Sequence, residues 1–185
     1  MPMLARASDS VLVLIDIQER LSAAIDAAAL QAVAKNAGIL LQAAACLDIP
    51  VLATEQYPKG LGPTIAPVAV LLPETARRFE KTSFSCGGDD SFLHALEAEG
   101  RPQAVLVGME SHVCVLQSAL DLRQAGREVF VVADACSSRN PANHANAMDR
   151  MRAAGVVITN TESVAFEWLR NARHTSFKAL SALLR

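Results

Sequence analysis

The sequence predicts an α/β fold: an open, doubly wound, six-stranded parallel sheet in the order 3-2-1-4-5-6, with helices on both faces in three layers. Two observations support this prediction. Short apolar, β-branched runs alternate with longer alanine- and leucine-rich stretches along the whole chain. Most of the short runs are continuously apolar, which is typical of parallel strands covered by helices on both sides.

The expected strands occupy residues 11–15, 50–53, 77–80, 104–107, 128–132 and 156–158. The third run contains two arginines and a glutamate, which favours the edge of the sheet. Helical patterns cover residues 29–48, 89–99, 112–125, 142–154, 162–170 and 175–184. Residues 55–73 are rich in proline and glycine and interrupt the alternation. We expect them to form a long functional loop over the carboxyl edge of the sheet.

Composition places the chain among well-packed globular proteins. Of its 185 residues, 51% are hydrophobic and 19% are charged, so we expect one domain over residues 1–185. A net charge of −2 provides no basic face for nucleic acid. No apolar stretch approaches the roughly 20 residues that span a bilayer. Because the first residues also lack a signal-peptide core, we expect a cytoplasmic protein without a membrane partner.

The cysteines and histidines show no spacing that predicts a metal site. The four cysteines are scattered without a CxxC pair, and the four histidines form no HxH, HxxxH or HExxH motif. We therefore expect no metal, no cofactor and no disulfide framework. Cys46 and Cys136 are expected in the core, and Cys86, near Lys81, is a minor candidate for lining a pocket.

Three reactive side chains follow the ends of three predicted strands. In open α/β sheets, ligands bind beyond the carboxyl ends of the strands where the strand order reverses, here between the first and the fourth strand. Asp16 directly follows the first strand, Lys81 the third, and Cys114 comes a few residues after the fourth. An acid, a base and a thiol are thus predicted at one rim.

Each of these residues has a functional and a structural interpretation. Asp16 is a candidate general base, although a helix cap or a simple ion pair is the alternative. Lys81 is a candidate partner for it, although a lysine at a strand end is more often a surface charge. Cys114 lies near the start of a helix predicted to begin at Ser111, where the helix dipole favours a thiolate and backbone N–H groups can bind an oxyanion. The alternative for Cys114 is a buried structural cysteine.

Four segments together resemble a known family. They are Leu14-Ile15-Asp16-Ile17-Gln18, Lys81-Thr82-Ser83-Phe84-Ser85, Gly108-Met109-Glu110-Ser111-His112-Val113-Cys114-Val115 and Val132-Ala133-Asp134-Ala135-Cys136-Ser137-Ser138-Arg139. In this order they resemble the isochorismatase-like cysteine hydrolases, which include nicotinamidases and other amidohydrolases. The run from Thr54 to Gly62 and the later Thr161-Glu162-Ser163 resemble the subgroup called isochorismatase domain-containing proteins.

The resemblance implies an Asp–Lys–Cys catalytic triad at Asp16, Lys81 and Cys114. It also implies a cis peptide bond between Met109 and Glu110, which would direct the N–H groups of Glu110 and Cys114 into an oxyanion hole. A homo-oligomer, dimer or higher, is implied as well. Nicotinamidases carry an Asp and His metal set after the second strand, where this chain has Glu55-Gln56-Tyr57, so nicotinamidase activity is disfavoured.

The resulting hypothesis is hydrolysis of a small amide-like C–N bond through a thioester at Cys114. The resemblance and the predicted rim suggest that Gln56, Tyr57, Leu61 and Phe84 line the substrate pocket. A non-catalytic scaffold or binding protein of the same fold, and a redox-active thiol protein, remain the alternatives. A nucleotide-binding fold is disfavoured, because Gly60-Leu61-Gly62 is followed by proline and does not open a helix after a strand.

Overall fold

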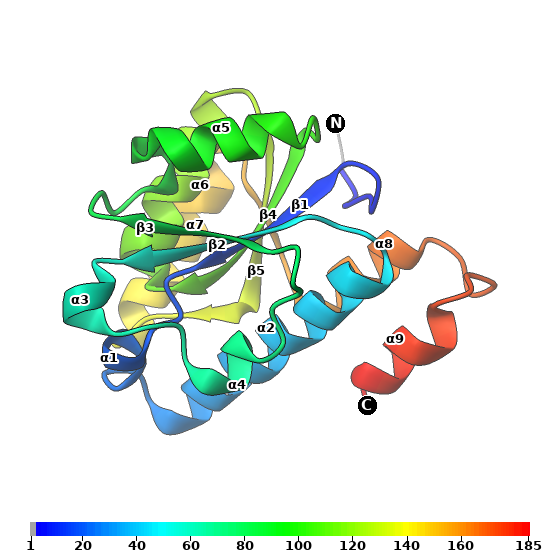
Figure 1. Cartoon of the computed structure of the whole chain (residues 1–185), viewed down its shortest axis with the longest axis horizontal. Helices are drawn as coiled ribbons and strands as arrows, with labels where there is room; N and C mark the ends of the chain where they lie inside the picture. The colour runs from blue at the N-terminus through cyan, green and yellow to red at the C-terminus, as the bar shows by residue number, and fades with distance from the viewer. Residues whose placement is uncertain (1–2) are drawn as a thin grey trace.

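A computed structural model describes residues 3–185 as a single sheet with helices on both faces (Figure 1). The strands are β1 (Ser10–Ile15), β2 (Val51–Gln56), β3 (Arg77–Lys81), β4 (Gln103–Met109), β5 (Glu128–Ser137) and β6 (Val157–Thr159). Their order is β3-β2-β1-β4-β5-β6, and every neighbouring pair is parallel. The predicted fold class and strand order are confirmed, and β3, with its charged residues, lies at the edge as expected.

The helices range from α2, with 20 residues, to the four-residue helices α1, α3 and α4. They are α1 (Glu19–Ser22), α2 (Ala27–Cys46), α3 (Pro58–Leu61), α4 (Ala66–Ala69), α5 (Asp90–Ala98), α6 (Leu116–Gln124), α7 (Pro141–Ala153), α8 (Thr161–Leu169) and α9 (Phe177–Leu183). A 3₁₀ turn spans Cys86–Gly88, and one π-helical turn, Ser111–Val115, runs directly into α6. Among residues 3–185, no helix has both the length and the apolar composition that crossing a bilayer requires.

Alternation of side chains along the strands produces two hydrophobic cores. In β1, Leu12 and Leu14 belong to the core under α2, α4, α8 and α9. Val11, Val13 and Ile15 point to the opposite face and join the core under α5, α6 and α7. The period of two in a strand sends successive side chains to opposite faces, so a continuously apolar strand is required where both faces are covered. Figure 1 shows β1 in the middle of these layers.

The segment 55–73 differs from the prediction of one long loop. Glu55 and Gln56 complete β2, and the rest contains the two short helices α3 and α4. Pro58 and Pro67 each lie within the first two positions of these helices, where proline costs no backbone hydrogen bond and its fixed φ suits the helix. Two of the four prolines in this segment, Pro58 and Pro67, therefore start short helices, whereas Pro63 and Pro73 lie outside them.

Candidate active site

Asp16 takes up a left-handed backbone conformation directly after β1, with φ of 50°. Its N–H donates to the carbonyl of Thr54 on β2, which holds Asp16 at the carboxyl ends of the central strands. The side chain is fully buried, and both of its oxygens are used. Thr54 Oγ1 donates to Oδ1 at 2.8 Å, and Lys81 Nζ donates to Oδ2 at 2.7 Å. The carboxylate is thus held by one side chain from β2 and one from β3.

Lys81 ends β3 with its ammonium surrounded by oxygen atoms. Besides Asp16, Nζ donates to Gln56 Oε1 at 2.8 Å and to the carbonyls of Phe84 at 2.9 Å and Ser83 at 3.2 Å. The side chains of Lys81 and Asp16 both have 0% exposure. A charge this deeply buried is tolerated only when it is paired and fully hydrogen-bonded, and both conditions are met here.

Gln56, one of the predicted pocket residues, contacts Lys81. It is buried, and its amide links the Lys81 ammonium to the carbonyl of Thr82, to which Nε2 donates at 2.8 Å. Gln18 holds the Gln56 backbone from both sides: its Oε1 accepts from Gln56 N–H at 2.7 Å, and its Nε2 donates to the Gln56 carbonyl at 3.0 Å. Gln56 therefore belongs to the support of Lys81.

Cys114 lies in the π-helical turn between β4 and α6 and is almost entirely buried. Burial raises the pKa of its thiol, and the negative charge of Asp16 raises it further, while Lys81 acts in the opposite direction. Burial and Asp16 thus favour the protonated thiol and oppose the thiolate expected at the helix start. Burial away from water disfavours the charged form of the thiol, which opposes the effect of the helix dipole. Asp16 influences the Cys114 thiol directly, since its hydrogen bond to the thiol also raises the pKa.

Gly108 allows β4 to pass close to β1 immediately before this turn. Its φ is +129°, and a Cβ built on it would lie 1.9 Å from the carbonyl oxygen of Ile15. Only glycine fits this approach, which brings the end of β4 next to Asp16. The register between β4 and β5 also shifts between Leu106 and Gly108.

The peptide bond between Met109 and Glu110 is cis. The Glu110 side chain is buried and turned toward the segment after β5, where Oε1 accepts from Arg139 N–H at 3.0 Å. Arg139 Nε lies 3.6 Å from the same oxygen. The Glu110 carboxylate thus points to the β5–α7 connection, and its backbone begins the turn that contains Cys114.

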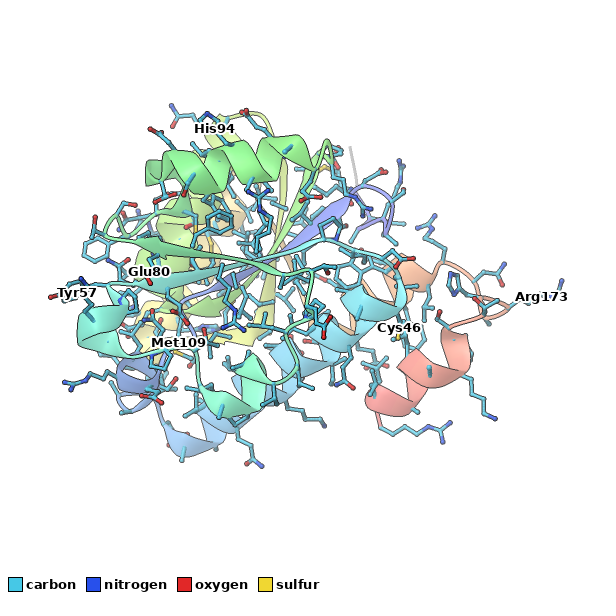
Figure 2. All side chains as sticks on the ribbon, in the orientation of Figure 1. Cys46, Tyr57, Glu80, His94, Met109 and Arg173 are labelled. Atoms are coloured by element: carbon cyan, nitrogen blue, oxygen red, sulfur yellow. The ribbon has the colours of Figure 1, made fainter. Side chains whose placement is uncertain are left out.

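The three other predicted pocket residues lie at the outer rim. Tyr57 is 56% exposed and Phe84 is 54% exposed, while Leu61 of α3 is half-buried. The backbone of both aromatic residues supports Lys81, because Tyr57 N–H donates to the Lys81 carbonyl and the Phe84 carbonyl accepts from Nζ. Figure 2 shows Tyr57 at the end of the molecule where β2 and β3 finish, far from Arg173.

The remaining cysteines divide by burial. Cys86 is fully buried behind the site, with Sγ 3.9 Å from Thr54 Oγ1, and burial raises the pKa of its thiol to about 11. Burial raises the pKa of Cys136 to about 12, in agreement with its predicted packing role. Cys46 was expected in the core but is exposed, because it is the last residue of α2 and lies beyond the helix face that packs on the sheet (Figure 2). Within residues 3–185, no three His, Cys, Asp or Glu side chains gather to hold a metal ion.

Sequence reasoning missed several residues that support the site. Thr54 and Gln18, which stand in the sequence only as parts of motifs, position Asp16 and Gln56. The available signal was their place after predicted strands, at the same rim as Asp16. His144 was overlooked because it is far from Cys114 in sequence, although its Nδ1 lies 2.9 Å from Oγ of Ser111, the first residue of the π-helical turn.

Comparisons with known proteins agree with the motifs. The isochorismatase domain matches residues 10–163. Isochorismatase domain-containing protein 2 of Danio rerio is 40% identical over 176 residues, which cover 95% of this chain and 86% of the zebrafish protein. The chain is also similar in structure to MAR1 ribonuclease from Caenorhabditis elegans, with a TM-score of 0.92 and 34% identity over 98% of this chain and 92% of that chain.

A bacterial structure extends this similarity. The ycaC gene product of Escherichia coli, described as an octameric hydrolase of unknown specificity, matches with a TM-score of 0.91 and 26% identity, covering 100% of this chain and 91% of that chain. The resemblance to the isochorismatase domain-containing proteins, first inferred from the motifs, is confirmed by the zebrafish relative. The chain therefore belongs to the isochorismatase family.

Proposed function

We propose that this protein is a cysteine-dependent hydrolase that cleaves a C–N bond in a small amide-like substrate, with Asp16, Lys81 and Cys114 as its catalytic triad. The observation that supports the proposal is a buried ion pair, Asp16 with Lys81, beside a buried thiol whose pKa responds to both charges. The family is one of hydrolases, and such a juxtaposition of nucleophile and base is typical of covalent catalysis.

The first half of the reaction forms a thioester. Asp16 takes the proton of the Cys114 thiol, and the thiolate attacks the carbonyl carbon of the substrate to form a C–S bond. The carbonyl oxygen becomes an oxyanion, which the N–H groups of Glu110 and Cys114 bind. When the C–N bond breaks, the proton on Asp16 passes to the leaving nitrogen, which departs as an amine or ammonia. Lys81 keeps the Asp16 carboxylate oriented throughout.

The second half uses water. Asp16 takes a proton from a water molecule while the water oxygen attacks the thioester carbon. The new oxyanion occupies the same oxyanion hole. The C–S bond then breaks, the proton on Asp16 returns to the sulfur, and the carboxylic acid product leaves. We propose that the exposed Tyr57 and Phe84 and the half-buried Leu61 contact the substrate.

A ribonuclease activity is the second candidate, and the specific observation in its favour is the name of the Caenorhabditis elegans protein. The net charge of −2 favours a small-molecule substrate over RNA, because RNA-binding faces are strongly basic. We also propose a homo-oligomer, as in the octameric bacterial hydrolase, and a reducing, cytoplasmic location, which suits four free cysteines.

The test is a panel of small primary amides, carbamoyl compounds and an RNA oligonucleotide, assayed with the wild-type protein, Cys114→Ala and the matched variant Cys86→Ala. We expect ammonia release from at least one amide or carbamoyl compound by wild type and by Cys86→Ala, and none by Cys114→Ala. Hydrolysis that survives in Cys114→Ala overturns the assignment of Cys114 as the nucleophile. Cleavage of RNA alone favours the ribonuclease. No turnover by the wild type favours a scaffold, and a reversible mass loss of two hydrogens on oxidation favours a redox thiol.

A further inference from the structure

The π-helical turn that contains Cys114 is tied by two hydrogen bonds to the chain that follows β5, one to α7 and one to the β5–α7 connection. Ser111 Oγ of the turn lies 2.9 Å from Nδ1 of His144 on α7. His112 Nδ1 of the turn lies 3.0 Å from Oγ of Ser138, which follows β5. We call these four residues the Ser–His clamp. Each bond joins one serine to one histidine. The turn contributes the serine to the first bond and the histidine to the second.

The two serines of the clamp are shielded from solvent, and its two histidines are half-buried. Ser111 and Ser138 are buried, and His144 is half-buried. Burial lowers the pKa of His144, so its imidazole is neutral at physiological pH. Water competes little for a buried serine hydroxyl. Losing either bond therefore leaves a buried serine oxygen without its partner.

The turn needs external support because it has no cap of its own. Glu110 precedes the turn, but its side chain makes no capping hydrogen bond and is instead held by Arg139. The longer helices α2, α5, α7 and α8 differ in this respect, since each is capped by the side chain of an Asp or Asn at its N-cap position. Ser138, Arg139 and His144 instead hold the side chains of the residues that begin the turn.

We infer that the Ser–His clamp is the positioning device of the nucleophile, with His144 as its positioning residue. The clamp fixes the first two residues of the turn, and thereby keeps the Cys114 thiol against Asp16 and its N–H beside that of Glu110. His144 acts through Ser111 and does not contact the substrate. This inference rests on the proposed function, because it assigns the purpose of the clamp to catalysis at Cys114.

The geometry suggests two matched variants. His144→Asn places an amide nitrogen or oxygen where Nδ1 stands, so the bond to Ser111 is preserved. His144→Gln reaches to the position of Nε2 and loses that bond. A cavity of about 310 Å³ adjoins His144, Ser138 and Arg139, which leaves room for either side chain. His94→Gln, at an exposed site on α5, controls for the loss of a histidine as such.

Two readouts are expected to move in opposite directions. In His144→Gln, kcat falls about tenfold with little change in KM, because the bound substrate meets a misplaced thiol. The rate of Cys114 alkylation by iodoacetamide at pH 8 rises, because a loosened turn exposes the thiol and its pKa falls toward the ordinary value. His144→Asn and His94→Gln behave as wild type in both measurements, and thermal unfolding verifies that all variants are folded.

The alkylation readout is independent of any substrate, so it separates this inference from the proposed function. If His144→Gln alkylates at the wild-type rate, or if His144→Asn changes as much as His144→Gln, the clamp does not position Cys114 and the inference is overturned. If the alkylation rates change as expected while Cys114→Ala keeps full hydrolytic activity, the clamp stands as a device for the turn and the nucleophile assignment fails.

Discussion

The Lys81 ammonium and the Asp16 carboxylate lie 2.7 Å apart with no solvent exposure of either side chain. The two residues end strands that are not neighbours, since β2 separates β3 from β1. They meet over the end of β2, whose Thr54 and Gln56 bind one member of the pair each. The pair therefore depends on the packing of three strands, and it places a negative charge beside Cys114 without leaving that charge uncompensated.

Replacing Lys81 by methionine removes one partner and leaves Asp16 buried without a counter-charge. We expect the free energy of unfolding at pH 7, measured by urea denaturation, to fall by about 3–5 kcal/mol. Arg152→Met is the control, because it breaks a pair with Asp149 of similar length, 2.8 Å, at the surface. Its effect should stay within about 0.5 kcal/mol. Equal effects of the two substitutions would contradict the proposed role of burial.

Alkylation of Cys114 should be slow at neutral pH. Its raised pKa keeps the thiol protonated, so iodoacetamide should modify it more slowly than exposed Cys46 at pH 7. Asp16→Asn removes a charge that raises this pKa and should accelerate the reaction at pH 8. Lys81→Met removes a charge that lowers it and should slow the reaction.

Peptide-resolved mass spectrometry, with Cys46 as internal standard, gives the three rates in one experiment. A change in the same direction for Asp16→Asn and Lys81→Met would show that the two charges do not act on the thiol as the structure indicates.

Buried thiols should make the protein less stable in alkali. A cysteine in the unfolded chain loses its proton near the ordinary pKa of 9.0, whereas folded Cys86 and Cys136 hold theirs to about 11 and about 12. The folded state therefore binds more protons above pH 9, and its stability falls as pH rises from there. By pH 10.5 each thiol should account for a loss of about 2 kcal/mol.

Urea denaturation of Cys136→Ala at pH 8 and pH 10.5 measures this effect. The variant should lose less stability between the two pH values than the wild type, whereas Cys46→Ser, at an exposed position, should lose as much. An unchanged pH dependence in Cys136→Ala would argue against thiol burial as the cause.

Gly108→Ala should abolish folding, or lower the free energy of unfolding by more than about 4 kcal/mol, because the new methyl group would meet the Ile15 carbonyl at 1.9 Å. The matched substitution is Gly100→Ala, where φ is +64° and nothing lies within 4 Å of the added atom. Its cost is only that of the left-handed backbone, about 1 kcal/mol. Soluble yield and urea denaturation compare the two. A stable Gly108→Ala protein would mean that β1 and β4 can separate at this point.

The strands were predictable because they are buried on both faces. The apolar runs at residues 11–15 and 104–107 have no polar interruption, and both form central strands. The charged run at 77–80 identified the edge for the same reason. The segment 55–73 was misjudged because proline breaks a helix interior and also begins a helix, and the sequence pattern alone does not separate these two uses.

Placement of Asp16, Lys81 and Cys114 at one edge followed from strand order, since parallel strands end on the same side of a sheet. Their local chemistry did not follow. Strand order does not reveal that Gln56 binds the Lys81 ammonium, or that burial and Asp16 raise the pKa of the Cys114 thiol. Both features concern desolvation and exact partners, which depend on side chains from several strands.

The sequence by itself determined the fold class, the strand order and the family of this protein, because periodic burial and short motifs are local properties of the chain. The tertiary structure alone decided which groups neutralise Lys81, how Cys114 ionises, and that His144 reaches Ser111 across 33 positions of sequence. These outcomes depend on distances between atoms from separate elements, and electrostatic and hydrogen-bond energies change steeply with those distances and with burial.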